Sequence, residues 1–69
     1  MNQDYTWFVV SERGIESGWE YKSDAQDNYN EMREYLGKTV SLKVVSKRTL
    51  IQGGLNPMDD GFWAKGAYG

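Results

Sequence analysis

The chain has 69 residues, 14% of them aromatic, and contains neither cysteine nor histidine. One domain of this length buries only about 60% of the surface that unfolding exposes, so aromatic side chains must supply much of its core. The lack of cysteine excludes disulfides and thiolate metal sites and favours a cytoplasmic setting, and the net charge of −2 is too small to predict a polyanion binder. The longest apolar run, 7–10, is far shorter than the ~20 residues that span a bilayer, so neither export nor membrane insertion is expected.

The first predicted element is a strand over residues 5–11, in which every residue of the run 5–10 is β-branched or aromatic. Alternation divides these side chains between two faces, with Tyr5, Trp7 and Val9 on one and Thr6, Phe8 and Val10 on the other. Because neither face is polar throughout, this strand is expected at the centre of a small sheet.

A hairpin at residues 12–14 leads into a second strand over 15–22, with Gly14 free to adopt a positive φ. Gly18 predicts either a bulge or a close contact with another backbone segment. The strand is expected to be half-buried, with Ile15, Ser17, Trp19 and Tyr21 facing inward and Glu16, Gly18, Glu20 and Lys22 facing outward.

A helix is predicted over residues 24–36. Ser23 and Gln26 match a capping box, in which two side chains satisfy free N–H groups at a helix start. Gly37 is expected to end the helix in the left-handed conformation. Apolar residues recur at spacings of four, three and four and form one stripe, made of Ala25, Tyr29, Met32 and Leu36.

Period-two alternation over residues 38–46 predicts the third strand. Its inward side chains are expected to be Val40, Leu42 and Val44, and its outward ones Thr39, Ser41 and Lys43. Ser46 is expected to cap a short helix over 47–52 that sends Leu50 and Ile51 to the core and ends at Gly53-Gly54, with the apolar Leu55 just beyond. A fourth strand over 49–52 is the alternative.

The remaining segment, 56–69, is predicted to be an irregular aromatic tail. Asn56 and Pro57 have the pattern of a short capped turn, with Asp59 and Asp60 after them. The whole chain is therefore expected to be one α+β domain, 1–69, with a ββαβ order. A right-handed crossover gives a three-stranded sheet in the order 2-1-3, the first strand central and the main helix on one face.

Several residue types needed for catalysis are missing. Without histidine and cysteine the chain lacks the commonest general base and the commonest strong nucleophile. The run Asp59-Asp60-Gly61 lacks the alternating ligands of a calcium loop, and Gly53-Gly54 lacks the Gly-Lys-Ser/Thr of a phosphate loop. We therefore expect neither an enzyme nor a metal or cofactor site.

Three surfaces are candidates for binding. The first is an acidic stripe on the helix with spacings of three, four and three, formed by Asp24, Asp27, Glu31 and Glu34. Only Arg33 and Lys38 stand near it as partners, and an unpaired acidic face attracts basic surfaces of other proteins.

The second candidate is the sheet face together with the tail, comprising Tyr5, Trp7, Val9, Phe62 and Trp63. Large aromatic side chains dominate interface hot spots, so this group predicts a partner site or a homodimer interface. The alternative is that Phe62, Trp63 and Tyr68 fold back over the face that carries Trp7, because a small domain with two apolar sheet faces needs to cover both.

The third candidate is a single-stranded nucleic-acid site. Tyr5 and Trp7 would stack bases on an open sheet face, and a basic cluster would contact phosphates, namely Lys43, Lys47 and Arg48. The acidic balance of the chain weighs against it, because phosphate neutralisation is the usual source of affinity.

The leading prediction is thus a small non-enzymatic protein-binding module of the inhibitor or adaptor type. A nucleic-acid binder is the alternative and a homodimeric structural protein the third. The chain also resembles short bacterial and phage proteins in style, a resemblance carried by Gly18-Trp19-Glu20-Tyr21, Ser23-Asp24-Ala25, Ser46-Lys47-Arg48-Thr49-Leu50 and Gly54-Leu55-Asn56-Pro57. It implies no residue role.

Overall fold

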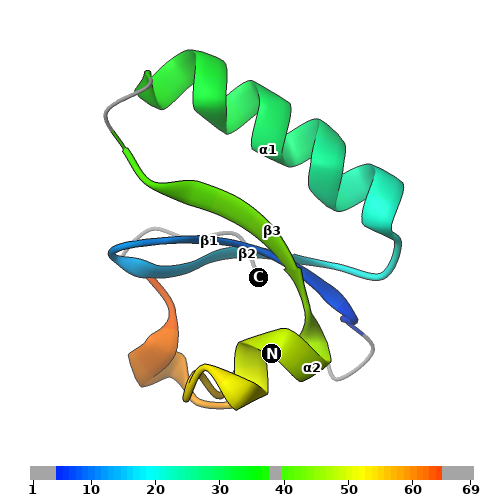
Figure 1. Cartoon of the computed structure of the whole chain (residues 1–69), viewed down its shortest axis with the longest axis vertical. Helices are drawn as coiled ribbons and strands as arrows, with labels where there is room; N and C mark the ends of the chain where they lie inside the picture. The colour runs from blue at the N-terminus through cyan, green and yellow to red at the C-terminus, as the bar shows by residue number, and fades with distance from the viewer. Residues whose placement is uncertain (1–4, 38–39, 65–69) are drawn as a thin grey trace.

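The computed structural model describes residues 5–37 and 40–64 (Figure 1). The described elements are strands β1 (Trp7–Ser11), β2 (Gly14–Trp19) and β3 (Leu42–Ser46), helices α1 (Lys22–Leu36) and α2 (Lys47–Gln52), and a 3-10 turn at Asp60–Phe62. β1 is central and pairs antiparallel with both neighbours, in the order β2-β1-β3. The predicted α+β fold and strand order are confirmed. The strand predicted from residue 38 begins at Leu42, and residues 38–39 and the predicted tail residue Tyr68 lie outside the described residues.

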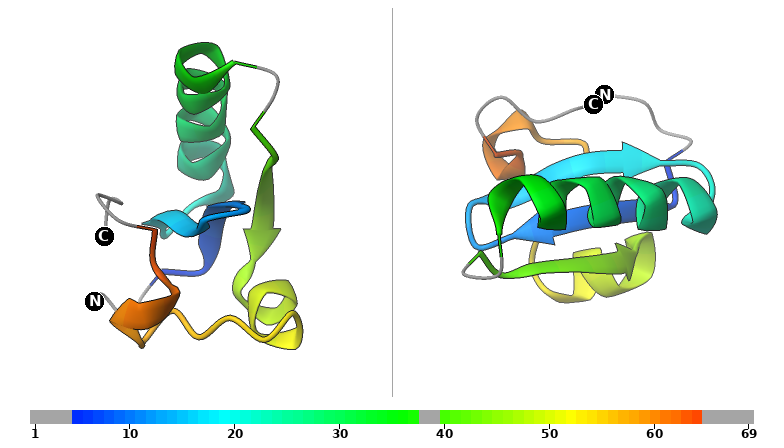
Figure 2. Two further views of the ribbon diagram at one scale, coloured as in Figure 1. Left: turned by 90° about the vertical axis from the view of Figure 1, so that its left-hand side faces the viewer. Right: turned by 90° about the horizontal axis from the view of Figure 1, so that it is seen from above.

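The sheet lies between α1 on one face and α2 with the 3-10 turn on the other (Figure 2). The cluster under α1 is centred on Val9, Ala25 and Leu42. The cluster on the opposite face is built from Phe8, Val10, Ile15 and Leu50. Each face of β1 is therefore covered by helical structure. In residues 5–37 and 40–64, no helix combines the length and the apolar character needed to cross a bilayer.

The apolar stripe of α1 is confirmed, because Ala25, Tyr29, Met32 and Leu36 all belong to the cluster beneath the helix. The capping box is wrong. The helix begins at Lys22, and the Tyr21 carbonyl accepts the Ala25 N–H at 3.2 Å, so Ser23 falls inside the first turn and caps nothing. Gly37 ends the helix with φ +82° and ψ −174°. Its positive φ is as predicted, but its ψ is extended.

A bulge in β2 changes which residues share a face. Val9 pairs with Ser17 and Val10 with Ile15, which leaves Glu16 as the extra residue. Since one inserted residue reverses the alternation, Ile15 reaches the Phe8 cluster while Trp19 packs under α1. The prediction that Ile15 shares the face of Ser17 and Trp19 is therefore wrong. Glu16, predicted to face outward, is only 3% exposed.

Gly18 lies outside this bulge and meets a side chain rather than a backbone. A Cβ at this position would lie 2.4 Å from Cδ2 of Tyr5. Tyr5 precedes β1 and packs edge-on against Phe8, with ring centroids 6.4 Å apart. Its predicted place on the face of Trp7 and Val9 is therefore wrong.

α2 forms as predicted, and the alternative strand over 49–52 is excluded. The Ser46 hydroxyl accepts the Thr49 N–H at 3.3 Å. At the other end, the Gly54 N–H donates to Ile51 and the Leu55 N–H donates to Leu50, which together form a Schellman motif with Gly54 at φ +87°. Leu50 is buried as predicted, but Ile51 is 53% exposed and does not reach the core.

The segment after α2 crosses back to β2. The Asp59 carboxylate accepts the Gly61 N–H at 2.9 Å and starts the 3-10 turn. Trp63 then forms an isolated parallel bridge with Ile15, where the Ala64 N–H donates to the Ile15 carbonyl at 2.8 Å. Phe62 and Trp63 cover the Phe8 face, so the expectation that the tail covers Trp7 is wrong. Because α1 occupies the Trp7 face, the opposite face is the one left for the tail.

Candidate functional site

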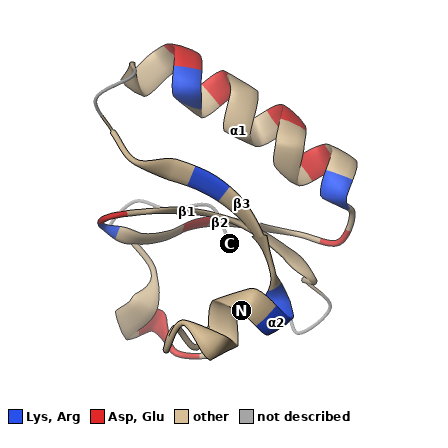
Figure 3. Ribbon diagram, viewed as in Figure 1, with Lys and Arg blue, Asp and Glu red and all other residues tan. Residues whose placement is uncertain are grey.

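The four predicted carboxylates of α1 lie in the solvent. Asp24, Asp27, Glu31 and Glu34 are all exposed. The apolar stripe turns one side of α1 to the sheet, and the helical spacing carries the carboxylates around the other side. Figure 3 shows acidic positions recurring along the whole length of the helix. This group, the acidic face, spans the eleven residues 24–34, whose ten steps of 1.5 Å make about 15 Å of helix.

Arg33, predicted as a partner of the acidic face, is turned away from it. Its guanidinium donates to the carbonyls of Val40 at 2.6 Å and Gly37 at 3.2 Å, with longer contacts of 3.4 Å to Leu42 O and Tyr29 Oη. All of these acceptors are neutral, so the arginine fastens the end of α1 to the segment that enters β3. Its charge does not pair with the carboxylates.

Lys22, the other described cation of α1, is also engaged elsewhere. Its Nζ lies 5.1 Å from the ring centroid of Trp7, within cation–π range. Among residues 5–37 and 40–64, the ion pair within 4.0 Å joins Arg13 to Glu16, and no carboxylate of the acidic face has such a partner. Lys38, the second predicted partner, lies outside the described residues.

An exposed tyrosine borders the acidic face and was not predicted. Tyr35 is 89% exposed, lies four positions after Glu31 and directly follows Glu34. Residues four apart on a helix are neighbours, so the ring stands beside Glu31. The sequence does carry one indication of this exposed ring, because Tyr35 is the aromatic residue of the helix that falls outside the apolar stripe.

The predicted sheet-face site is not formed. Val9 is fully buried and Trp7 packs in the same cluster under α1. Tyr5, Phe62 and Trp63 pack against Phe8 on the other side of the sheet. These five residues are therefore divided between two covered faces and do not make one surface for a partner or a second copy.

The aromatic surface predicted for stacking nucleic-acid bases is not formed either, because its two rings lie on different faces of the sheet. Trp7 is held between α1 and the sheet, and Tyr5 lies on the opposite face. Among the basic residues, Lys43 is exposed on β3, Arg48 is exposed on α2, and Lys47 is half-buried. Lys43 and Lys47 are four positions apart, which is about 13 Å along an extended strand. Tyr5 and Trp7 therefore form no common stacking surface for a nucleic-acid strand.

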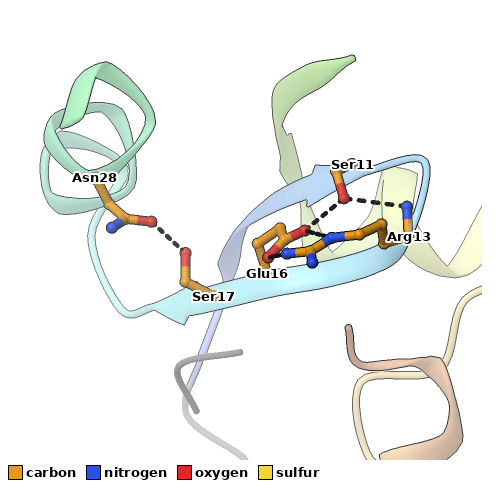
Figure 4. A network of polar contacts seen from close by, with 5 residues as sticks. All are labelled: Ser11, Arg13, Glu16, Ser17 and Asn28. Carbon is orange, nitrogen blue, oxygen red and sulfur yellow. Dashed lines mark hydrogen bonds and ion pairs between the residues drawn. The ribbon is translucent and has the colours of Figure 1, made fainter. Parts of the chain in front are cut away.

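Glu16 has a structural environment that the sequence did not reveal (Figure 4). Arg13 donates Nε to Oε2 at 3.0 Å and Nη2 to Oε1 at 2.9 Å, while the Ser11 hydroxyl donates to Oε2 at 2.6 Å. A buried carboxylate is costly unless it is paired and hydrogen-bonded. Here both oxygens are satisfied within one hairpin, so Glu16 holds the bulge and the turn together.

A second buried polar contact joins β2 to α1. The Ser17 hydroxyl donates to Asn28 Oδ1 at 2.6 Å and accepts the Trp19 indole N–H at 2.8 Å. Asn28 is 7% exposed and stands beside the apolar stripe. Its position fixes the rotation of α1 over the sheet and thereby turns the acidic face outward.

The described residues contain no group of three or more histidine, cysteine or acidic side chains arranged to hold a metal ion. No match is found between this chain and known protein families, curated proteins or solved structures. The candidate site is therefore defined by its own geometry, as an exposed row of four carboxylates with Tyr35 at its border.

Proposed function

We propose that this chain is a non-enzymatic, cytoplasmic protein-binding module that presents the acidic face of α1 to a basic surface of a partner protein. The observation that carries the proposal is the engagement of both described α1 cations elsewhere: Arg33 binds carbonyl oxygens and Lys22 covers Trp7. Among residues 5–37 and 40–64, the four exposed carboxylates therefore form a row of negative charge without a direct ion-pair partner.

The acidic face is unfavourable for the helix that bears it. Asp27 lies four positions before Glu31, and Glu31 three positions before Glu34, so like charges are neighbours. Each such pair destabilises a helix by about 0.2–0.5 kcal/mol. Glu34 also stands in the last turn, where a negative charge opposes the helix dipole. The presence of a locally destabilising pattern supports a role in binding, because function is a common reason for such a cost.

The partner surface is expected to be rich in arginine and lysine. Carboxylates accept two parallel hydrogen bonds from a guanidinium, and the exposed ring of Tyr35 offers a cation–π contact beside Glu31. Binding should therefore be fast and sensitive to salt, since exposed charges lose their long-range attraction as the Debye length shortens.

The test compares two double variants that change the net charge equally. Glu31→Gln with Glu34→Gln neutralises half of the acidic face, whereas Glu12→Gln with Glu20→Gln removes two exposed carboxylates outside it. Each chain is immobilised, and the proteins captured from an extract of the source cells are identified and then purified for affinity measurements.

The first double variant should bind the purified partner roughly tenfold more weakly, and the control should change affinity by less than about twofold. Wild-type binding should weaken as NaCl is raised from ~0.1 M to ~1 M, over which the Debye length falls from about 10 Å to about 3 Å. Equal loss of affinity in both variants, or binding that is indifferent to salt, would exclude the acidic face as the binding site.

A further inference from the structure

The chain carries a second surface of the opposite sign. Residues 35–58 contain no aspartate or glutamate and four basic residues. Three of these basic residues are described and lie in β3 and the first turn of α2: Lys43, Lys47 and Arg48. Figure 3 shows basic positions there and acidic ones along α1.

The two edges of the sheet differ in how they are covered. Along β2, Trp63 and Ala64 pair with Ile15, so the chain itself covers this edge at Ile15. Along β3, the Lys47 N–H donates to Thr6 O at 2.8 Å. Hydrogen-bonded pairs alternate with non-hydrogen-bonded pairs along an antiparallel ladder. The backbone groups of Lys43 and Val45 are therefore the ones that bond to β1, and the N–H and C=O of Val44 point outward from the sheet.

The contact of Arg33 with Leu42 supports this assignment. Leu42 lies two positions before Val44, so the backbone groups of both residues point to the same side of β3. The Leu42 carbonyl lies 3.4 Å from the guanidinium of Arg33, which approaches from outside the β1–β3 pair. Among the described residues, no backbone hydrogen bond outside the ladders involves Val44. The open part of the β3 edge is therefore centred on this residue.

A small cavity opens beside this edge, between β3 and α2. Its volume is about 210 Å³. Most of its wall is apolar, and Lys43 is the charged residue among those that line it. The lining residues are Val10, Lys43, Val45, Thr49, Leu50, Gly53 and Leu55.

We propose that the β3 edge binds an extended, acidic peptide segment of a partner protein by strand addition. In an added antiparallel strand, the residue opposite Val44 exchanges backbone hydrogen bonds with it, and the residues on either side stand opposite Val45 and Lys43. Side chains of these two flanking positions point to the α2 face. The one opposite Val45 enters the cavity as a large apolar group, and the one opposite Lys43 is a carboxylate.

The observations favour this occupant over two others. The phosphates of a nucleic-acid strand would contact the basic residues, but such a strand would not pair with the open backbone N–H of Val44 or fill the apolar cavity. A second copy paired through its own β3 about Val44 would bring the two Lys43 side chains to diagonal positions on one face, where like charges repel. An acidic peptide uses the edge, the cavity and the charge together.

The probe is a blocked peptide of the order Thr-Phe-Thr-Glu-Thr, titrated into the full ¹⁵N-labelled chain and followed by amide chemical shifts. The Val44 amide should shift most and become protected from hydrogen exchange. N-methylation of the central threonine, whose N–H faces β3, should weaken binding about tenfold or more, because a pairing hydrogen bond is lost to a bulky group. N-methylation of the glutamate, whose N–H faces solvent, is the matched control and should change affinity by less than about twofold.

Two further measurements complete the test. Lys43→Glu should weaken the peptide roughly three- to tenfold, as expected for reversal of one exposed charge contact, while Glu31→Gln should leave it unchanged because the acidic face is not involved. The proposal is overturned if the peptide does not bind, if both methylated peptides bind equally, or if Lys43→Glu binds as well as the wild type. It is also overturned if single-stranded DNA shifts the Val44 amide instead, or if self-association already protects that amide in the free chain.

Discussion

Replacing Glu31 and Glu34 with glutamine should make the fold more stable while it weakens partner binding. The change removes two like-charge neighbour contacts, Asp27 with Glu31 and Glu31 with Glu34, each unfavourable by about 0.2–0.5 kcal/mol. It also removes a negative charge from the last turn of α1, where the dipole interaction is unfavourable by about 0.3–1 kcal/mol. Because both side chains are exposed, no packing is lost. The free energy of unfolding should rise by roughly 1 kcal/mol.

Urea and thermal denaturation followed by circular dichroism measure this change. For a domain of this size, 1 kcal/mol corresponds to an increase in Tm of roughly 4–8 °C. The control, Glu12→Gln with Glu20→Gln, removes the same charge from outside α1 and should not raise Tm. Added NaCl should stabilise the wild type more than the glutamine variant, since screening removes the same repulsion. An unchanged or lower Tm in the glutamine variant would show that the carboxylates are compensated and would remove the electrostatic basis of the proposed function.

Three further substitutions test the packing. Gly18→Ala should destabilise the fold by about 1–3 kcal/mol through overlap with the Tyr5 ring, and most of that loss should disappear in a Tyr5→Ala background measured by the same urea titrations. Gly54→Ala should cost about 1 kcal/mol because φ is +87°, whereas Gly53→Ala, at φ −81° and with ordinary contacts of 3.5 Å, should be neutral within ~0.5 kcal/mol; equal effects would contradict the C-cap assignment. Trp63→Ala should cost about 3 kcal/mol, because the ring packs edge-on to Phe8 and its indole N–H donates to the Pro57 carbonyl. Partner capture by folded Trp63→Ala should persist, and its loss would mean that the tail contributes to binding.

The sequence predicts well those features that depend on local periodicity or local capping. The stripe of α1 follows from spacing alone, and the Ser46 cap and the Gly54 turn follow from neighbouring residue types. The order of the strands follows from the handedness of a single crossover. The exposure of the acidic face follows from the stripe, because the two occupy different sides of one helix.

The features that the sequence does not predict depend on tertiary packing, at positions where the local sequence fits two arrangements equally well. Both faces of β1 are apolar, so the sequence does not specify that α1 covers Trp7 rather than Phe8. The bulge at Glu16 is also not predicted by the sequence, because a polar residue in an alternating strand is expected to face solvent. Its burial is favourable because Arg13 and Ser11 bind its carboxylate. The β3 edge and its cavity required the placement of α2, which periodicity does not give.

The bridge between Ile15 and Trp63 also bears on the time course of folding. β1, β2, α1 and β3 are built from residues 7–46 and can pair as soon as that part of the chain is available. The cluster around Phe8 is different, because its covering side chains come from residues 50–63. Contacts between residues so distant in sequence form slowly. A nascent chain that has not yet presented residues 50–63 therefore exposes one apolar sheet face and both strand edges, and this interval is the one in which the protein is most open to aggregation.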